Sequence, residues 1–480
     1  MTAIQTPDWV KHAVFYQIFP DRFARGVDPR DRLPQSAIDL EPWDAPPTNE
    51  GYKGGNLWGV IEKLSYLQDL GITAIYLTPI FQSASNHRYH THDYYQVDPL
   101  LGGNEALRAL IDAAHDRDIK IVLDGVFNHA SRGFFQFNDI LEHGPHSPWL
   151  DWFRVTDWPL SAYDGAKPAN YESWVGNRAL PQFNHDNPDV REYIMRIGEY
   201  WIREGIDGWR LDVPFEVKTP GFWQEFRDRI KAIDPEAYIV GEVWSHAAPW
   251  LDGTAFDAVM NYELTGPILA FAAGDRIHED MVGGHDYAPY PALDAAGYAA
   301  KIERLFGLYD WQIHLAQLNL LDSHDTPRAV TLADGDRGSL CIALFLMFTF
   351  PGAPCIYYGD EVGLAGAHDP DCRRSFPPEE AWDRDLLEMC RTLIALRRQH
   401  SALRTGEYQT AIARGSVYGF VRRDADGAFL GLANVGMEPV SVAIAELGVA
   451  LGDRVFGAIE RNGDELTLAP RSVGLLALTS

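Results

Sequence analysis

The chain has 480 residues, of which 46% are hydrophobic and 23% charged, and its formal net charge is -27. This composition is typical of a globular protein with an ample core, and the length predicts two or three domains. The acidic balance argues against nucleic-acid binding, because phosphate recognition needs a basic surface, and it fits a neutral substrate. The most apolar run, residues 340–350, is too short to span a bilayer, so no membrane association is predicted.

The cysteines and the start of the chain predict a cytoplasmic protein. The first residues show no basic segment followed by an apolar run, so no signal peptide is visible. The four cysteines are too few and too late in the chain for a disulfide framework, and we expect them to be reduced. They are Cys341, Cys355, Cys372 and Cys390.

Short apolar strands alternate with helical patterns along most of the chain. The predicted strands are Ala13 to Phe19, Thr73 to Leu77, Ile119 to Leu123, Gly208 to Leu211, Tyr238 to Gly241, Ala258 to Met260, Leu315 to Leu321 and Cys355 to Tyr358. Helical spacing is clearest at residues 57–70, 107–114, 190–201, 222–233, 339–350 and 386–398. This alternation implies a parallel sheet, and eight units are the count of a closed (β/α)8 TIM barrel.

Two segments do not follow this alternation of strands and helices. Residues 131–187 are aromatic, polar and rich in proline, with no clear period, which predicts an inserted domain after the third strand. Past residue 403 short alternating strands with turn signals predict a C-terminal antiparallel β-sandwich. The predicted division is therefore a barrel from 1–130 and 188–402, an inserted domain at 131–187 and a β domain at 403–480.

Charged or polar clusters end four of the predicted strands. They are Asp124 to His129 after the third, Arg210 and Asp212 at the fourth, Glu242 after the fifth, and Asp322 to Asp325 after the seventh. In a β/α barrel these ends share one face, where active sites lie. We therefore expect the clusters to converge.

Converging carboxyl groups without a thiolate or a histidine ligand cluster indicate acid/base chemistry at an acetal. Glycosidases need one ionised and one protonated carboxyl group. Asp212 is expected to stay ionised beside Arg210, which suits a nucleophile, and Glu242 in an apolar setting suits the acid. Asp325 suits stabilisation of a positively charged transition state, and His129 and His324 suit hydrogen bonding to sugar hydroxyls.

These motifs, in this order and phase, resemble the four shared motifs of the α-amylase family of glycoside hydrolases (family 13). The resemblance implies a retaining α-glucan hydrolase that forms a covalent glycosyl-enzyme. It implies Asp212 as nucleophile, Glu242 as acid/base and Asp325 as transition-state stabiliser. It places Asp124, His129, Arg210 and His324 in the surrounding shell, where Asp124 either contacts substrate or only orients Arg210.

Finer motifs resemble the neopullulanase, cyclomaltodextrinase and maltogenic amylase group. They are Phe15 to Phe23, Asn86 to Tyr89, Leu180 to Asn184, Gly241 to Trp244 and Asp369 to Arg374. The match implies that His87 and Tyr89 line the non-reducing side of the cleavage point and that Trp244 lines the leaving-group side. Asp369 and Arg373 would contact the next sugar out.

Two departures from that group bear on specificity. The group usually carries an extra N-terminal β domain that shapes a dimer, whereas the barrel pattern here begins almost at once. It also usually has Asp where this chain has His90. We therefore leave cyclodextrin preference and oligomeric state open.

The predicted substrate is an α-1,4-linked maltooligosaccharide or a related α-glucan, with α-1,6 bonds or cyclodextrins as further substrates. A transglycosylase of the same fold and a non-catalytic carbohydrate-binding relative are the alternatives. Many relatives bind calcium through the residue that matches Asn128, but the sequence supplies no complete set of oxygen ligands, even with the loop at 26–31. No cofactor or metal is therefore predicted to be required.

Overall fold

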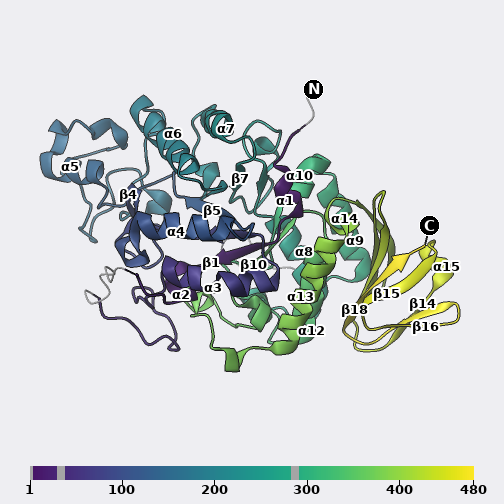
Figure 1. Ribbon diagram of the computed structural model, residues 1–480. Coiled ribbons are helices and arrows are strands. Elements are labelled where there is room, and N and C mark those ends of the chain that lie inside the picture. The colour runs from purple at the N-terminus through teal and green to yellow at the C-terminus, as the bar shows by residue number, and fades with distance from the viewer. Residues whose placement is uncertain (1–3, 30–37, 283–290, 480) are drawn as a thin grey trace.

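Eight short parallel strands form the centre of the computed structural model, which describes residues 4–29, 38–282 and 291–479 (Figure 1). They are β1 (Phe15–Ile18), β2 (Ala74–Leu77), β5 (Lys120–Gly125), β6 (Gly208–Leu211), β7 (Tyr238–Gly241), β8 (Ala258–Val259), β9 (Leu318–Asn319) and β10 (Ala353–Tyr357). Their order in the sheet is β8-β7-β6-β5-β2-β1-β10-β9, and a parallel bridge between Met260 and Leu318 joins the two ends. The predicted (β/α)8 barrel is confirmed.

Helices follow the strands and cover the outside of the barrel. The longer ones are α3 (Leu57–Leu70), α4 (Gly103–His115), α6 (Pro188–Arg203), α7 (Phe222–Ile233), α8 (Tyr262–Ala272), α9 (Ala295–Phe306), α12 (Arg337–Thr349) and α13 (Arg384–Gln399). Shorter ones are α1 (Asp8–His12), α2 (Pro20–Phe23), α10 (Trp311–Ala316), α11 (Ala329–Leu332) and α14 (Ser401–Arg404). The ends of α3 illustrate the local rules: the Asn56 side chain accepts from Gly59 N at 2.9 Å, and Gly71 ends the helix with φ of 98°.

The prediction for the seventh strand was too long. Residues 315 and 316 belong to α10, which begins after Asp310, whose side chain accepts from Gln312 N. The strand itself is only Leu318–Asn319. An apolar run of this length fits a buried helix end and a buried strand equally well, so periodicity could not separate them.

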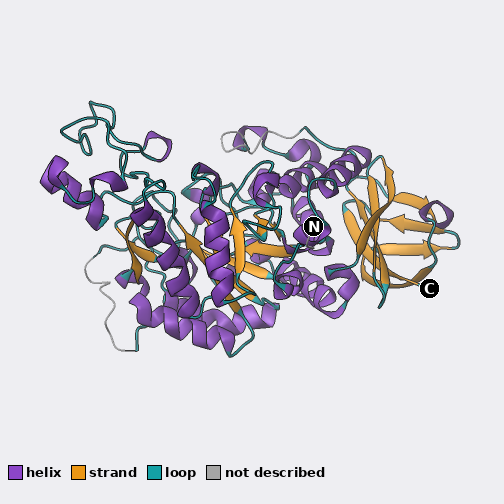
Figure 2. Ribbon diagram, turned by 90° about the horizontal axis from the view of Figure 1, so that it is seen from above, coloured by secondary structure: helices purple, strands orange, loops and turns teal. Residues whose placement is uncertain are grey.

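The segment after β5 contains little regular structure. It holds α5 (Phe135–His143) and isolated bridges such as Phe153 with Phe183, and His129 pairs with Gln182 to return the chain to the barrel. A hairpin of β3 (Phe81–Ser83) and β4 (Thr91–Val97) follows β2. Figures 1 and 2 show α5 at the end of the molecule opposite the C-terminal sheets.

Two antiparallel sheets form the C-terminal part. The first has the order β11 (Glu407–Arg414), β12 (Val417–Arg423), β13 (Ala428–Asn434), β18 (Ser472–Leu478), β15 (Leu451–Gly457), and the second β14 (Val440–Ala443), β17 (Glu465–Leu468), β16 (Ile459–Asn462). Leu430, Leu432, Leu466 and Leu476 pack together in their shared core. Four of these strands were predicted, and β11, β15, β16 and β17 were not.

Candidate active site

The strands bring the predicted charged clusters to one end of the barrel. Asp124 in β5 lies in register with Arg210 in β6, so the two side chains are neighbours across the sheet. Asp212 and Glu242 directly follow the paired strands β6 and β7, and Asp325 lies in the segment after β9. The expected convergence of sequence-distant strand ends is therefore found.

Arg210 is the fully buried centre of this group. Its Nη1 lies 2.9 Å from Asp124 Oδ1 and 3.2 Å from Asp212 Oδ1. Its Nη2 lies 3.1 Å from Glu242 Oε1. Tyr76 and Tyr89 both donate to Asp124 Oδ2, at 2.6 Å and 3.0 Å. One guanidinium thus holds three carboxylates, which explains why a buried strand carries an arginine.

Burial raises the pKa of both Asp212 and Glu242. For Asp212, burial and the nearby Glu242 outweigh the opposing charge of Arg210. For Glu242, burial outweighs Arg210, and Asp325 adds to the upward shift of the pKa. We expected Asp212 to stay ionised beside Arg210, but its pKa is raised, because Arg210 divides its charge among three carboxylates. The two carboxyls titrate as a pair.

One ion pair and two hydrogen bonds orient Glu242. Arg210 Nη2 and Trp244 Nε1 both lie 3.1 Å from Oε1, and Val213 N donates to Oε2 at 3.1 Å. Val213 has φ of 34°, a left-handed conformation that β-branched residues rarely adopt. Strain of this kind persists only where the surroundings impose it, which is common at functional sites. The strained residue directs its N–H onto the candidate acid.

Asp325 has the opposite electrostatic setting. Burial would raise its pKa, but His324 and Arg373 outweigh burial and lower that pKa below the ordinary aspartate range. His324 Nε2 lies 3.0 Å from Asp325 Oδ2, and Gln17 Nε2 lies 2.7 Å from His324 Nδ1. Asp325 is therefore the carboxylate best suited to remain ionised.

A cavity of about 530 Å³ opens over the three carboxyls. This volume is within the range of small-molecule sites. All of the predicted side chains that line it come from loops after strands or from the inserted segment. They are His87, Tyr89, His129, Asp212, Glu242, Trp244, Asp325, Asp369 and Arg373, whereas Asp124, Arg210 and His324 are at most 1% exposed and hold the lining in place. For Asp124 this favours the orienting alternative.

The histidines of the cavity are neutral hydrogen-bonding groups. Burial lowers the pKa of His129 to about 3, and its Nε2 has no hydrogen-bond partner among the described residues. Burial lowers the pKa of His87 well below its ordinary value, and Tyr89 N donates to His87 Nδ1 at 3.2 Å. His90 packs against His87 with ring centroids 5.0 Å apart and lines the same wall.

Arg373 lies closer to the carboxyl groups than expected. It was predicted to contact an outer sugar, but its Nη2 lies 3.3 Å from Asp325 Oδ1 and its Nε donates to His324 O at 2.8 Å. Its Nη1 pairs with Asp369 Oδ1 at 2.9 Å. Arg373 therefore joins the outer wall of the cavity to the centre.

Several residues of the site were not identified from the sequence. Gln17 and Tyr76 lie on β1 and β2, where their polar atoms face His324 and Asp124. Trp174, in the inserted segment, lines the cavity and stacks on His129 with ring centroids 5.5 Å apart. A polar residue inside an apolar strand was the available signal for Gln17. Nothing in the irregular inserted segment distinguished Trp174 from its neighbours.

The described residues give no sign of a metal centre. They contain no group of three or more His, Cys, Asp or Glu side chains arranged to hold a metal ion. The side chain of Asn128 accepts from Gln182 and contacts His129. Part of the acidic loop at 26–31 lies outside the described residues. Within the described part of the chain, no helix is both long and apolar enough to cross a membrane.

Comparison with known proteins gives consistent matches. The model of the α-amylase catalytic domain matches residues 17–405. A cyclomaltodextrinase from a Bacillus species is 43% identical over 437 residues, covering 90% of this chain and 74% of that protein. Neopullulanase 2 from Thermoactinomyces vulgaris is 43% identical over 87% of this chain and 68% of its own length. The crystal structure of a debranching enzyme from Nostoc punctiforme is 60% identical, with a TM-score of 0.92 over 99% of this chain and 100% of that one.

Proposed function

The chain belongs to the α-amylase family of glycoside hydrolases, and we propose that it hydrolyses α-1,4-glucosidic bonds in maltooligosaccharides with retention of configuration. The observation that carries this proposal is the convergence of Asp212, Glu242 and Asp325 around one cavity, two of them bound to the same guanidinium. Two carboxyls with raised pKa values beside a third with a lowered one provide both a proton and a fixed negative charge.

In the proposed reaction, Asp212 attacks the anomeric carbon while Glu242 gives its proton to the departing glycosidic oxygen. The bond from the anomeric carbon to that oxygen breaks, and a bond to Asp212 Oδ forms. Glu242, now ionised, takes a proton from water, whose oxygen displaces Asp212 and regenerates the carboxylate. Asp325 stabilises the positive charge that develops on the sugar, since its own pKa is lowered.

The lining residues suit recognition of a neutral sugar. We propose that His87, His129 and Arg373 bind hydroxyl groups, Tyr89 and Trp244 pack against sugar faces, and Asp369 holds Arg373. Asp124, Arg210 and His324 would orient the groups that touch the substrate. The relatives' names, a cyclomaltodextrinase and a neopullulanase, support α-glucans as the substrate class.

Cleavage of α-1,6 bonds is the second candidate. The solved structure that is 60% identical over almost the whole chain is of a debranching enzyme, and branches in α-glucans are α-1,6-linked. The active carboxyls would be the same, and only the path of the sugar chain through the cavity would differ.

Product analysis tests both linkages. We expect reducing sugar from maltotriose, from pullulan or from both, and none from either with Asp212→Asn. Proton NMR of the first product should show the α anomer. A β anomer would exclude the double displacement, and an inactive protein that binds maltotriose would favour the carbohydrate-binding alternative. Oligosaccharide products that are longer than the substrate would instead indicate transglycosylation.

A cytoplasmic location is also proposed. Its support is chemical: all four cysteines are free thiols and three of them are buried, as expected for a protein of a reducing compartment.

A further inference from the structure

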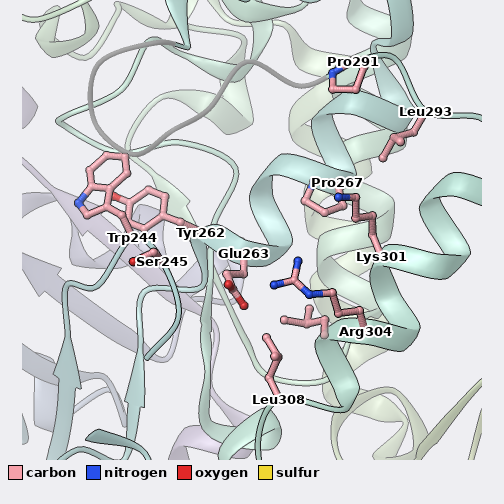
Figure 3. Close-up of a pocket in the computed structure, with 11 residues that line it drawn as sticks. Trp244, Ser245, Tyr262, Glu263, Pro267, Pro291, Leu293, Lys301, Arg304 and Leu308 are labelled. Carbon is pink, nitrogen blue, oxygen red and sulfur yellow. The ribbon is translucent and has the colours of Figure 1, made fainter. Parts of the chain in front are cut away.

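A second cavity, of about 300 Å³, lies between α8 and α9 beyond Trp244. Figure 3 shows Trp244 and Tyr262 at one side, Lys301 and Arg304 at the other, and Glu263 between them. Apolar side chains, including those of Leu293 and Leu308, fill the remaining wall. We call this the α8–α9 cavity.

The α8–α9 cavity adjoins the active-site cleft, because Trp244 lines both. Its indole stacks on Tyr262 with centroids 3.8 Å apart and an interplanar angle of 7°, so this aromatic pair lies where the two cavities meet. Trp244 Nε1 donates to Glu242, the carboxyl proposed to protonate the departing oxygen. The cavity therefore lies on the leaving-group side of the cleavage point.

The charged side chains of the cavity favour a neutral ligand rich in hydroxyls. Lys301 and Arg304 are exposed on α9, Glu263 is half-buried on α8, and none of the three forms an ion pair within the part of the chain that the structure describes. Two cations and one carboxylate provide both donors and acceptors without a strong net charge. Aliphatic and aromatic walls beside such groups match a glucosyl unit, which has C–H faces and a hydroxyl rim.

We propose that the α8–α9 cavity binds the outer glucosyl units on the leaving-group side of a long α-glucan chain. This inference rests on the proposed function and specifies its substrate: a chain long enough to pass Trp244 and reach α9. Lys301 and Arg304 then act as specificity-determining residues for chain length, because a short substrate ends before it reaches them.

The test compares a long and a short substrate in the same variants. For Arg304→Ala, the ratio of kcat/KM on maltooctaose to kcat/KM on maltotriose should fall about tenfold, since a hydrogen bond to a charged group is lost only with the long chain. Lys301→Ala should lower the ratio in the same direction. Glu303→Ala is the matched control, because Glu303 is exposed on the same helix but does not line the cavity. Its ratio should not change.

If the ratio of kcat/KM on maltooctaose to kcat/KM on maltotriose is the same in Arg304→Ala and Lys301→Ala as in the unmodified protein, the proposal is overturned. A binding measurement separates this outcome from failure of the proposed function. In a Glu242→Gln background, calorimetry should show weaker binding of maltooctaose when Arg304→Ala is added. If the unmodified protein cleaves neither substrate, the proposed function fails, and this binding comparison still decides whether the cavity holds glucan. If maltooctaose binds with equal affinity with and without Arg304→Ala, glucan binding in the α8–α9 cavity is excluded.

Discussion

Asp212 and Glu242 share one guanidinium and line one cleft, yet the reaction needs them in different protonation states. Both pKa values are raised, so the pair retains a proton above the ordinary carboxyl range. The ion pair with Arg210 and the N–H groups of Trp244 and Val213 favour the ionised form of Glu242. We infer that positive charge developing on the sugar beside Asp212 moves the shared proton to Glu242, where the leaving oxygen needs it.

Leaving-group chemistry tests this assignment. An alcohol leaving group needs a proton, whereas fluoride barely does. Glu242→Gln should nearly abolish maltotriose cleavage but retain measurable glycosyl-enzyme formation from α-maltosyl fluoride, followed by mass spectrometry. Asp212→Asn should lose both reactions, because no nucleophile remains. The reverse pattern would require the two roles to be exchanged.

The same pKa shift predicts a stability change. Because the folded-state pKa of Asp212 is raised, the folded protein binds this proton more tightly than the unfolded chain. The free energy of unfolding then falls as pH rises from the ordinary aspartate pKa, about 3.9, through the raised folded value. Asparagine does not titrate, so Asp212→Asn removes this fall in the free energy of unfolding. In the variant, Arg210 keeps Asp124 and Glu242 as partners.

We therefore expect Asp212→Asn to raise the Tm at pH 7, by about 1 °C for each kcal/mol of stability gained in a chain of this length, and to raise it less at pH 4, as measured by calorimetry. Asp228→Asn, at an exposed position of α7, is the control and should have little effect at either pH. A lower Tm for Asp212→Asn at pH 7 would show that its contact with Arg210 outweighs the burial of its charge.

At the scale of elements, strand ends were predictable and loop interiors were not. Apolar runs closed by Asp124, Asp212 and Glu242 marked their strands because buried charges are rare without a purpose. The strand at 318–319 and the unpredicted β11, β15, β16 and β17 are short or alternate weakly, so pairing with neighbours rather than local pattern defines them. The positions of Trp174 and Arg373 depend on the path of irregular segments. These segments have no hydrophobic periodicity from which that path could be predicted.

Arg328 fixes that irregular path at one point. Its buried guanidinium donates to Cys372 O at 3.0 Å, to Tyr358 O at 2.6 Å and to Asp360 Oδ1 at 2.8 Å. It thereby ties the segment after β9 to the segment after β10 and to the loop that carries Arg373.

Arg328→Met should lower stability by about 3–5 kcal/mol, because Asp360 would lose its buried partner. It should also lower kcat on maltotriose, since Arg373 would no longer be held against Asp325. Chemical denaturation and steady-state kinetics measure the two effects. Arg328→Lys, which keeps the charge, should recover part of the stability. Unchanged kcat in a destabilised Arg328→Met would restrict Arg328 to a structural role.

At the scale of the whole molecule, arginines join the barrel to the C-terminal sheets. Arg422 on β12 is fully buried and donates to Thr349 O at the end of α12, to Leu403 O in α14 and to Gly406 O just after α14. Arg397 on α13 donates to Phe350 O and to Leu403 O, the second of which also accepts from Arg422. Carbonyl oxygens that would otherwise be unpaired at a helix end are satisfied in this way.

Arg422 donates its hydrogen bonds to backbone carbonyl oxygens, and burial lowers its pKa to about 9. At neutral pH it is still charged, so its removal leaves several buried carbonyl oxygens without donors, each of which costs about 1–3 kcal/mol. Arg422→Met should therefore lower the Tm and separate the unfolding of the C-terminal sheets from that of the barrel, seen as two calorimetric transitions. Arg423→Met changes the exposed neighbour on the same strand and should leave a single transition at the original Tm. If Arg422→Met unfolds in one transition at the same Tm as Arg423→Met, apolar packing alone joins the two parts, and the arginine contacts contribute little to their coupling.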